Sequence, residues 1–339
     1  MQNLDFHSVE KYLSSNFIGY QGPSEFTKFS TGQSNPTYLI NAKSGNYVLR
    51  SKPPGILLKS AHAVEREYFV IKALQSSNIP LPKPFILCEN ENVAGSIFFV
   101  MSFVQGKNYS DPKLTSLTNE ERSKLYDHMN QVLSLIHNID IYKSGLEGFG
   151  KPGNYFERQV SRWTKQYQSS EIETISEMNQ LIKWLEVNTP LDDGRVSLVH
   201  GDYRIDNFII DNNQPIIKAV LDWELSTIGH PLADLSYQCM QWRMPEGKVG
   251  RGLAGVNRKK LGIPSEKEYL ELYCQRTGID KIRNWSFYLA FSCFRFAAIL
   301  QGVLKRSIEG NASNPEEAKK LGKMVPELSK MAIKIIEND

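Results

Sequence analysis

Acidic and amide side chains gather in the middle of the chain, in two segments that read VHGDYRIDNFII (199–210) and AVLDWE (219–224). Short apolar, β-prone runs surround them, so the polar residues are expected on loops held by strands. Carboxylate and amide oxygens are the ligands that Mg²⁺ prefers, and a magnesium-bound phosphate chain needs such hard ligands. The candidates in these loops are Asp202, Asp206, Asn207 and Asp222.

The spacing of these residues narrows the chemistry. His200, Asp202 and Asn207 reproduce the H-x-D-x-x-x-x-N order of a kinase catalytic loop, and Asp222 stands where the metal-binding Asp of D-F-G stands. HGDYRIDN and LDWELSTIGHPLADL thereby resemble the aminoglycoside phosphotransferase and choline kinase superfamily. Within it they look most like the phosphotransferase-like segments fused to acyl-CoA dehydrogenases. The resemblance runs from about residue 29 to about residue 311.

This resemblance implies a bilobal, protein-kinase-like α+β fold. A small antiparallel β-rich N-terminal lobe with one helix would span 1–105, and a large, mainly helical C-terminal lobe would span 106–339. The implied activity is transfer of the γ-phosphoryl group from ATP, bound with Mg²⁺, to a hydroxyl of a small molecule. Such a reaction depends mainly on positioning and charge neutralisation.

The resemblance also implies roles for the loop residues. Asn207 and Asp222 would bind the metal, and Asp202 would orient the acceptor hydroxyl and take its proton. His200 would hold the loop through a backbone hydrogen bond. Arg204 could neutralise developing charge or contact an anionic acceptor, and a salt bridge that braces the loop is the alternative. The roles of Asp206, Glu224 and His230 stay open, while Asp234 and His137 are expected to be structural.

Nucleotide-binding candidates lie in the N-terminal third of the chain. Predicted strands at 26–30, 37–41 and 47–52 form an antiparallel unit. The segment STGQSNP (30–36) joins the first two, where a kinase folds a loop over the phosphates. It has one glycine rather than G-x-G-x-x-G, so a plain hairpin turn is the alternative to an anion-binding nest. Its candidate phosphate contacts are Gly32, Gln33, Ser34 and Asn35.

Arg50 ends the predicted strand YVLR, at the position of the family's phosphate-binding cation. A surface arginine is the alternative, with Lys52 the nearest competitor for the role. A helix is predicted after Ser60, and Glu67 falls on its apolar side whereas Glu65 points away from it. Because an unpaired buried charge is costly, we expect Glu67 to pair with Arg50 and Glu65 to be solvated.

The strand at 96–106 is expected to run into the linker between the lobes. By resemblance, backbone groups of Ser102 and Val104 would bond the adenine edge, with Met101 packing beside it. An ordinary core strand is the alternative. Downstream, Thr118 and Glu121 predict a capping box that opens a helix.

Composition indicates an ordinary globular protein. Hydrophobic residues make up 41% and charged residues 23% of the chain, and the net charge of +3 is too small to indicate a nucleic-acid partner. Four scattered cysteines are expected to be free, buried thiols in a reducing compartment. No secretory signal is recognised at the N-terminus, which favours the cytoplasm. The apolar run 285–304 contains Arg295, so a buried helix is expected rather than a membrane span. The oligomeric state is left open.

The acceptor is expected to be a small, anionic molecule. Six basic residues and a single glutamate occupy the glycine-rich segment 241–260, which could be a lid or a solvated basic loop. With the resemblance above, this favours a phosphate-bearing alcohol such as a hydroxyacyl-CoA. Arg295, Gln301 and Arg306 are candidates to face it. An aminoglycoside kinase, a nucleotide-binding pseudokinase and a two-metal phosphoesterase are the alternatives, although the last lacks its histidine ligands.

Overall fold

The structure is a computed structural model of the 339-residue chain and describes residues 4–29, 35–53, 63–247, 251–310 and 314–338. Contacts within the chain define two compact units. The first unit contains the residues up to Lys107 together with Ser144–Leu146 and Asn207–Ser226, and the second contains the remainder. The predicted division of the chain at residue 105 stays a prediction.

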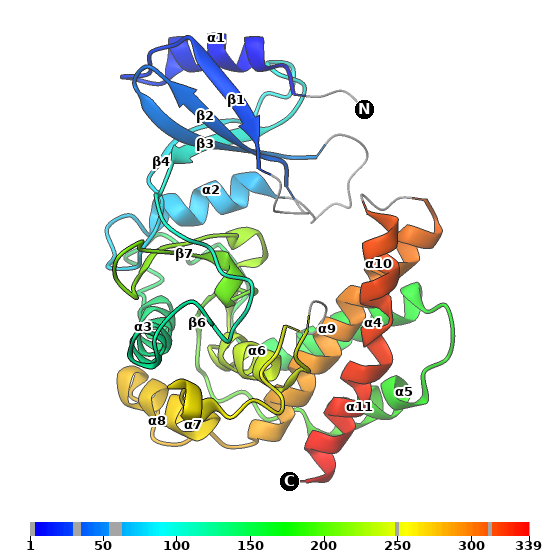
Figure 1. Cartoon of the computed structure of the whole chain (residues 1–339). Helices are drawn as coiled ribbons and strands as arrows, with labels where there is room; N and C mark the ends of the chain where they lie inside the picture. Colours follow the sequence, from blue (N-terminus) through cyan, green and yellow to red (C-terminus); the bar gives the residue numbers. More distant parts are fainter. Residues whose placement is uncertain (1–3, 30–34, 54–62, 248–250, 311–313, 339) are drawn as a thin grey trace. The chain divides into compact units, whose positions relative to one another are not determined.

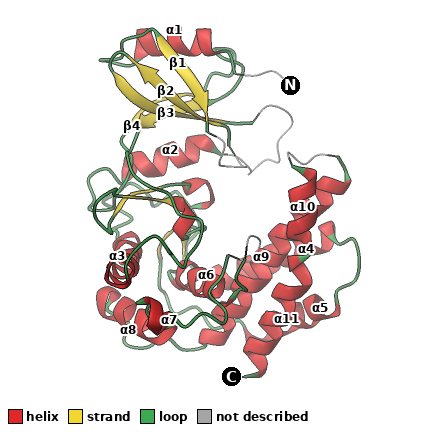
Figure 2. Ribbon diagram, viewed as in Figure 1, coloured by secondary structure: helices red, strands yellow, loops and turns green. Residues whose placement is uncertain are grey.

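A five-stranded antiparallel sheet organises the first unit, with strand order β1-β2-β3-β5-β4 (Figures 1 and 2). Its three N-terminal strands occur within a few residues of the predicted ones. The turn before β3 is glycine-dependent, since Gly45 has a φ of 132°. The strands are β1 (Ser24–Lys28), β2 (Thr37–Ala42), β3 (Gly45–Ser51), β4 (Pro84–Cys88) and β5 (Phe98–Ser102).

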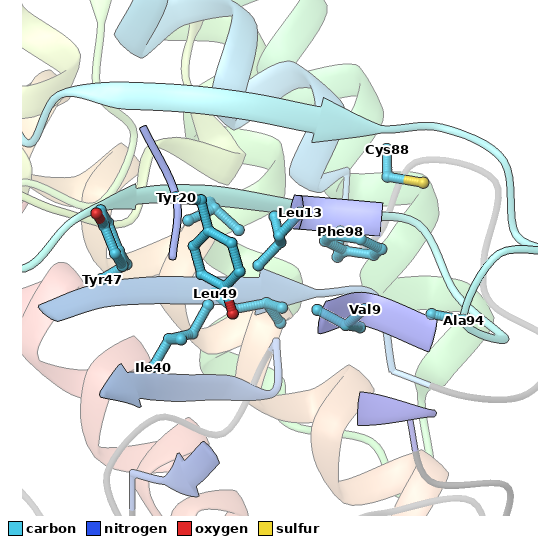
Figure 3. Close-up of a cluster of buried hydrophobic side chains, with 10 residues drawn as sticks. Val9, Leu13, Tyr20, Ile40, Tyr47, Leu49, Cys88, Ala94 and Phe98 are labelled. Carbon is cyan, nitrogen blue, oxygen red and sulfur yellow. The ribbon is translucent and has the colours of Figure 1, made fainter. Parts of the chain in front are cut away.

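Side chains along β3 and β5 point alternately to the two faces of the sheet. Leu49 and Phe98 point to one face, where they pack with Val9 and Leu13 of helix α1 (Phe6–Asn16) (Figure 3). This helix was not predicted, although Asp5 caps it by accepting hydrogen bonds from two backbone N–H groups. The opposite face of β3 is left for Val48 and Arg50.

Helix α2 (Val64–Ala73) lies on that opposite side of the sheet in Figure 1. The ring of Tyr68 packs edge-on against Phe99 of β5, with centroids 5.9 Å apart. The predicted cap Ser60 lies outside the described residues. Ala63 precedes the helix and makes no side-chain cap hydrogen bond.

A hairpin of β7 (Phe208–Ile210) and β8 (Ile217–Val220) completes the first unit. The backbone N–H of Lys107 donates to the Ile210 carbonyl at 2.7 Å. Gly106 permits this approach, because an added Cβ would lie 2.4 Å from the same carbonyl oxygen. Asn207 precedes β7 and Asp222 lies just after β8, so the hairpin holds both residues at its open end.

The second unit is mainly helical and is built around α9 (Trp285–Ile308), which packs against α4, α6, α10 and α11. By length and composition α9 could cross a membrane, but 78% of its apolar window is buried within the protein. The predicted core helix is thus confirmed. The other helices are α3 (Asn119–His137), α4 (Tyr155–Ser170), α5 (Ser176–Asn188), α6 (Leu232–Arg243), α7 (Arg258–Leu261), α8 (Glu266–Thr277), α10 (Pro315–Gly322) and α11 (Met324–Glu337).

Two local predictions concern a helix cap and the cysteines. Both hydrogen bonds of the capping box between Thr118 and Glu121 are present, as predicted. All four cysteines are free thiols, but Cys274 is only half-buried. A short sheet also forms, in which β6 (Ser197–Val199) pairs with β9 (Thr227–Gly229). It places the start of the predicted catalytic loop, at His200, beside the start of α6.

Candidate active site

In the first unit, Arg50 is the centre of a buried ion-pair cluster. Its Nε lies 3.0 Å from Glu67 Oε2, and its Nη2 donates to Asp222 Oδ1 at 2.9 Å. The pairing of Arg50 with Glu67 is confirmed, and Glu67 is 1% exposed. Glu65 lies 2.9 Å from Lys52 Nζ and is about one-third exposed, so it is only partly solvated and has a cation partner that was not expected.

The charges of this cluster depend on one another. Burial raises the pKa of the Glu67 carboxyl above its usual range, the Arg50 guanidinium opposes the shift, and Asp222 and Glu224 reinforce it. Burial also disfavours the charged guanidinium, but Glu67 and Asp222 outweigh burial and hold the pKa of Arg50 above its ordinary value. Arg50 is therefore a fixed positive charge whose fork contacts two carboxylates at once.

Asn207 and Asp222 come together through the backbone. The N–H of Leu221 donates to the Asn207 carbonyl at 2.8 Å, next to Asp222. Asp222 has a φ of 67°, in the left-handed region that non-glycine residues seldom adopt. Strained backbone of this kind is concentrated at functional sites. The packing of the hairpin thus fixes where this carboxylate points.

These two side chains suit Mg²⁺. A carboxylate and an amide supply hard oxygen donors, and Asp222 is 27% exposed. Among the described residues, no group of three or more His, Cys, Asp or Glu side chains is placed to hold a metal ion. Mg²⁺ commonly binds through one or two protein ligands together with phosphate oxygens and water, which agrees with this donor set.

Of the predicted phosphate-binding loop, Asn35 is described, whereas Gly32, Gln33 and Ser34 lie outside the described residues. Asn35 is 3% exposed, and its Nδ2 donates to Glu224 Oε2 at 2.6 Å. This contact gives Glu224 a partner that the sequence did not indicate. It joins the end of the predicted phosphate loop to the residue two positions after Asp222.

At the predicted adenine-binding strand, one backbone hydrogen bond limits which groups of Ser102 could contact a base. The Ser102 N–H donates to the Lys83 carbonyl at 2.8 Å, so this N–H is already engaged within the protein. Met101 is buried on the same sheet face as Arg50, and Val104 is half-buried beyond the strand. Their roles in nucleotide binding stay predictions.

In the second unit, the buried Asp234 of α6 holds the backbone of the predicted catalytic loop. Its carboxylate accepts from the N–H of His200 at 2.6 Å and from the N–H of Gly201 at 2.8 Å. His137 Nε2 contacts the same carboxylate at 3.2 Å. Burial works against ionisation of Asp234, but the His137 hydrogen bond and the other donors hold its pKa below the ordinary value. Both residues are structural, as expected.

The loop also presents Asp202 through contacts that only the structure shows. The Asp202 N–H donates to His200 Nδ1 at 3.2 Å, so His200 positions the loop, as predicted. The hydroxyl of Tyr237 donates to Asp202 Oδ1 at 2.8 Å. Tyr237 was not singled out from the sequence, although it lies three residues after Asp234 and hence on the same face of α6.

Arg295 supports the same loop rather than standing free in a pocket. Its Nη2 donates to the Gly201 carbonyl at 2.8 Å, and its Cζ lies 5.5 Å from the ring centroid of Tyr237 and 5.7 Å from that of Trp163. Gln301 is 3% exposed and donates to the Ser170 carbonyl at 3.0 Å. The expectation that Gln301 faces the acceptor is therefore wrong.

Two arginines share Asp206. The Arg204 guanidinium contacts the Asp206 carboxylate through two nitrogens, and Arg251 Nη1 donates to the same carboxylate at 3.2 Å. Of the alternatives for Arg204, the structure shows the loop-bracing salt bridge. Within segment 241–260, Arg243 is also paired, with Glu266 at 2.6 Å. Whether this segment is a lid stays a prediction, because 248–250 lie outside the described residues.

Each unit thus contains some of the groups that phosphoryl transfer requires. The first unit gathers a fixed cation and magnesium-type oxygen donors around Arg50, Asn207 and Asp222. The second holds the carboxylate of Asp202 by its backbone and by a tyrosine hydroxyl, which suits a base that must be positioned accurately.

Comparison with known proteins agrees with this chemistry. The model of the family described as "Phosphotransferase enzyme family" matches residues 25–278. Mouse acyl-CoA dehydrogenase family member 10 is 45% identical over 328 residues, which are 96% of this chain and 30% of that protein. Rat acyl-CoA dehydrogenase family member 11 is 40% identical, over 92% of this chain and 41% of that protein. The chain spans about a third to two-fifths of the length of these curated relatives.

Solved structures show the same fold. A candidate aminoglycoside phosphotransferase from Ralstonia eutropha JMP134 is 42% identical, with 99% of each chain covered and a TM-score of 0.89. A spectinomycin phosphotransferase, solved with ADP and spectinomycin, is 14% identical, with 97% of this chain and 98% of that chain covered and a TM-score of 0.63. At that identity the likeness supports the kinase-like α+β fold alone.

Proposed function

Because this chain belongs to the phosphotransferase enzyme family, we propose that it transfers the γ-phosphoryl group of ATP to a hydroxyl of a small, anionic metabolite. The observation that carries this proposal is the held carboxylate of Asp202, with its backbone fixed through Asp234 and its Oδ1 bonded to Tyr237. Such a carboxylate is suited to orient an acceptor hydroxyl. We place the activity in the cytoplasm, which the four free thiols support.

In the proposed reaction, Asp202 accepts the hydroxyl proton while the acceptor oxygen bonds to the γ-phosphorus and the bond from that phosphorus to the β,γ-bridging oxygen breaks. ADP leaves with the electrons of the broken bond. Arg50 contacts phosphate oxygens of the nucleotide, and Glu67 keeps Arg50 in place. Asn207 and Asp222 would hold Mg²⁺, which supplies charge neutralisation on the phosphate chain. Met101, Ser102 and Val104 accommodate the adenine.

A hydroxylated acyl-CoA is the acceptor we propose. Two curated relatives are named as acyl-CoA dehydrogenase family members, and this chain matches a part of each. A solved relative is instead described as a candidate aminoglycoside phosphotransferase. An enzyme that binds polycationic aminoglycosides is expected to line its acceptor site with acids. Here the Arg204, Asp206 and Arg251 group carries a positive excess, which favours an anionic acceptor.

The test measures ATP consumption by the purified chain with hydroxyacyl-CoA esters, free hydroxy acids and kanamycin, and identifies the product by phosphorus NMR. Asp202→Asn should lower kcat by about 10²–10⁴-fold while ATP still binds. Asp222→Asn should instead weaken binding of magnesium-ATP. Asp140→Asn, at an exposed loop position, is the matched control. Undiminished turnover by Asp202→Asn would refute the base assignment, and preferred phosphorylation of kanamycin would refute the anionic acceptor.

A further inference from the structure

A wide, open groove of about 1180 Å³ lies along helix α4 in the second unit. Its walls come from α4 itself, from the turn before the helix (151–154) and from Asp192. None of the described residues that line it belongs to the loop that carries Asp202, or to α6. This groove, called the α4 groove below, has no part in the proposed reaction.

Positive charge is in excess in the α4 groove, where four cations face two acids. Within the part of the chain that the structure describes, no ion pair engages any of these cations, which are Lys151, Arg158, Arg162 and Lys165. One of the acids, Asp192, already accepts hydrogen bonds from the backbone N–H groups of Asn154 and Gly194, at 2.9 Å and 3.2 Å. The groove therefore attracts negatively charged ligands.

Three of the cations form a row. Arg158, Arg162 and Lys165 are four and three residues apart, so they lie on one side of α4 with about 5–6 Å between neighbouring Cβ atoms. Arg162 and Lys165 are exposed, and Arg158 is half-buried. A guanidinium group binds phosphate oxygens through two N–H groups at once. A short chain of linked phosphates can bridge neighbouring cations in such a row, whereas a single carboxylate engages one of them.

The indole of Trp163 connects this row with the loop that carries Asp202. The Cζ atoms of Arg162 and Arg295 lie 5.5 Å and 5.7 Å from the centroid of the indole ring, so two cations share one aromatic side chain. Arg295 Nη2 donates to the carbonyl of Gly201 at 2.8 Å, directly before Asp202 in the chain. The groove and the loop are therefore joined by contacts within one unit.

The electrostatics of Tyr155, the first residue of α4, show the same proximity. Burial raises the pKa of Tyr155 to about 12, and the charges of Arg295, Arg162 and Arg158 all oppose this rise. Cations that act on one buried group also repel one another. An anion that neutralises the groove reduces the repulsion on Arg295 and so strengthens its contact with the loop.

We propose that the α4 groove binds a ligand with two or three linked phosphate groups, and that the bound ligand steadies the loop that carries Asp202 through Trp163 and Arg295. The ligand is an effector that is not consumed, because the groove contains no group that the proposed reaction uses. The binding itself does not depend on the kinase activity, whereas any effect on turnover rests on the proposed function.

Calorimetry without Mg²⁺ tests the binding, with inorganic tripolyphosphate and ADP as two sources of linked phosphates and hexaglutamate in place of an acidic protein segment. The double variant Arg162→Gln with Lys165→Gln should weaken tripolyphosphate binding by about tenfold or more, because charged hydrogen bonds to phosphate are lost. Of the two sources, the one whose affinity falls more is the better ligand of the groove. The matched control Arg283→Gln removes an exposed arginine outside the groove and should change nothing.

Three results would overturn the binding proposal. The first is an equal affinity of tripolyphosphate for the wild type and the double variant. The second is tighter binding of hexaglutamate than of either phosphate ligand. The third is loss of all tripolyphosphate binding in Arg50→Met, which would place the ligand at the predicted nucleotide site. Both groove substitutions replace exposed side chains, and circular dichroism checks that the fold is kept.

Hydrogen exchange of the backbone over residues 199–207 tests the coupling. Saturating tripolyphosphate should slow exchange there by about twofold or more in the wild type, the size expected for relief of one like-charge repulsion near the surface. It should have no effect in the double variant. Binding that leaves exchange in this loop unchanged would overturn the coupling. Neither measurement reads turnover, so failure of the groove and failure of the proposed kinase activity are distinguishable.

Discussion

Replacing Arg50 by methionine should destabilise the first unit by an amount that depends on pH. The substitution leaves the Glu67 carboxyl 1% exposed and without its cation. A buried carboxylate in that position takes up a proton rather than remain charged. The free energy lost is therefore limited by the cost of protonating an ordinary glutamate at the working pH.

That limit can be worked out from the ordinary glutamate pKa. At pH 7 the solution lies about 2.7 pH units above the usual value of about 4.3, and each unit corresponds to about 1.4 kcal/mol. In the wild type, burial already raises the pKa of Glu67 to about 8 with Arg50 in place, so both proteins bear this cost below pH 8, and Arg50→Met should add about 1.4 kcal/mol for each pH unit above it. The sign follows from linkage, because a carboxyl with a raised folded pKa keeps its full stability only below its unfolded pKa and loses stability as pH rises.

Urea unfolding followed by tryptophan fluorescence, at pH 7, 8 and 9, measures the effect. The matched control is Lys52→Met, which removes a cation from the partly exposed pair with Glu65 and should cost no more than about 1 kcal/mol at any of these pH values. The double variant Arg50→Met with Glu67→Gln should lose most of the pH dependence. A loss from Arg50→Met that is the same at pH 7 and pH 9 would refute the reasoning.

Three further predictions follow from single contacts. Tyr237→Phe should lower kcat by about tenfold, the usual worth of a hydrogen bond to a charged group; an unchanged kcat would limit the hydroxyl to packing around Asp202. Burial lowers the pKa of His230, so the stability that neutral His230 contributes should be lost as pH falls below about 6.5. The Tm of His230→Gln should therefore decline less from pH 8 to pH 5.5 than the Tm of the wild type. An equally steep decline would show that another group causes the loss. Asn35→Ala and Glu224→Leu should each weaken ATP binding, and the double variant should be no worse than either single variant; additive losses in calorimetry would show that Asn35 acts on its own.

Prediction from the sequence was most successful for features that depend on residues close together along the chain. The strands around the catalytic loop, the capping box at Thr118 and the core helix α9 follow from periodicity and local hydrogen bonding. The Arg50–Glu67 pair was predictable as well. A glutamate on the apolar side of a helix needs a cation, and the resemblance to kinases indicated which one.

Other features of the protein could not be predicted from the residues near them in the sequence. Glu65 was expected to be solvated because helical periodicity gives the direction of its side chain but does not give the position of Lys52, its partner in the structure. Gln301 looked like a pocket residue until the packing of α9 against α4 directed it to the Ser170 carbonyl. Helix α1 was missed because its amphipathic pattern is short and gains its stability from the sheet face that it covers.

The sequence by itself determined the reaction class, because the order of acid, amide and second acid along the chain is enough to indicate a kinase-type loop. Only the tertiary structure decided which groups control these acids. Asn35 meets Glu224 across 189 positions, and Tyr237 meets Asp202 across 35. Contacts at such separations depend on how β8 and α6 pack within their units, and side-chain type and spacing do not encode that packing locally.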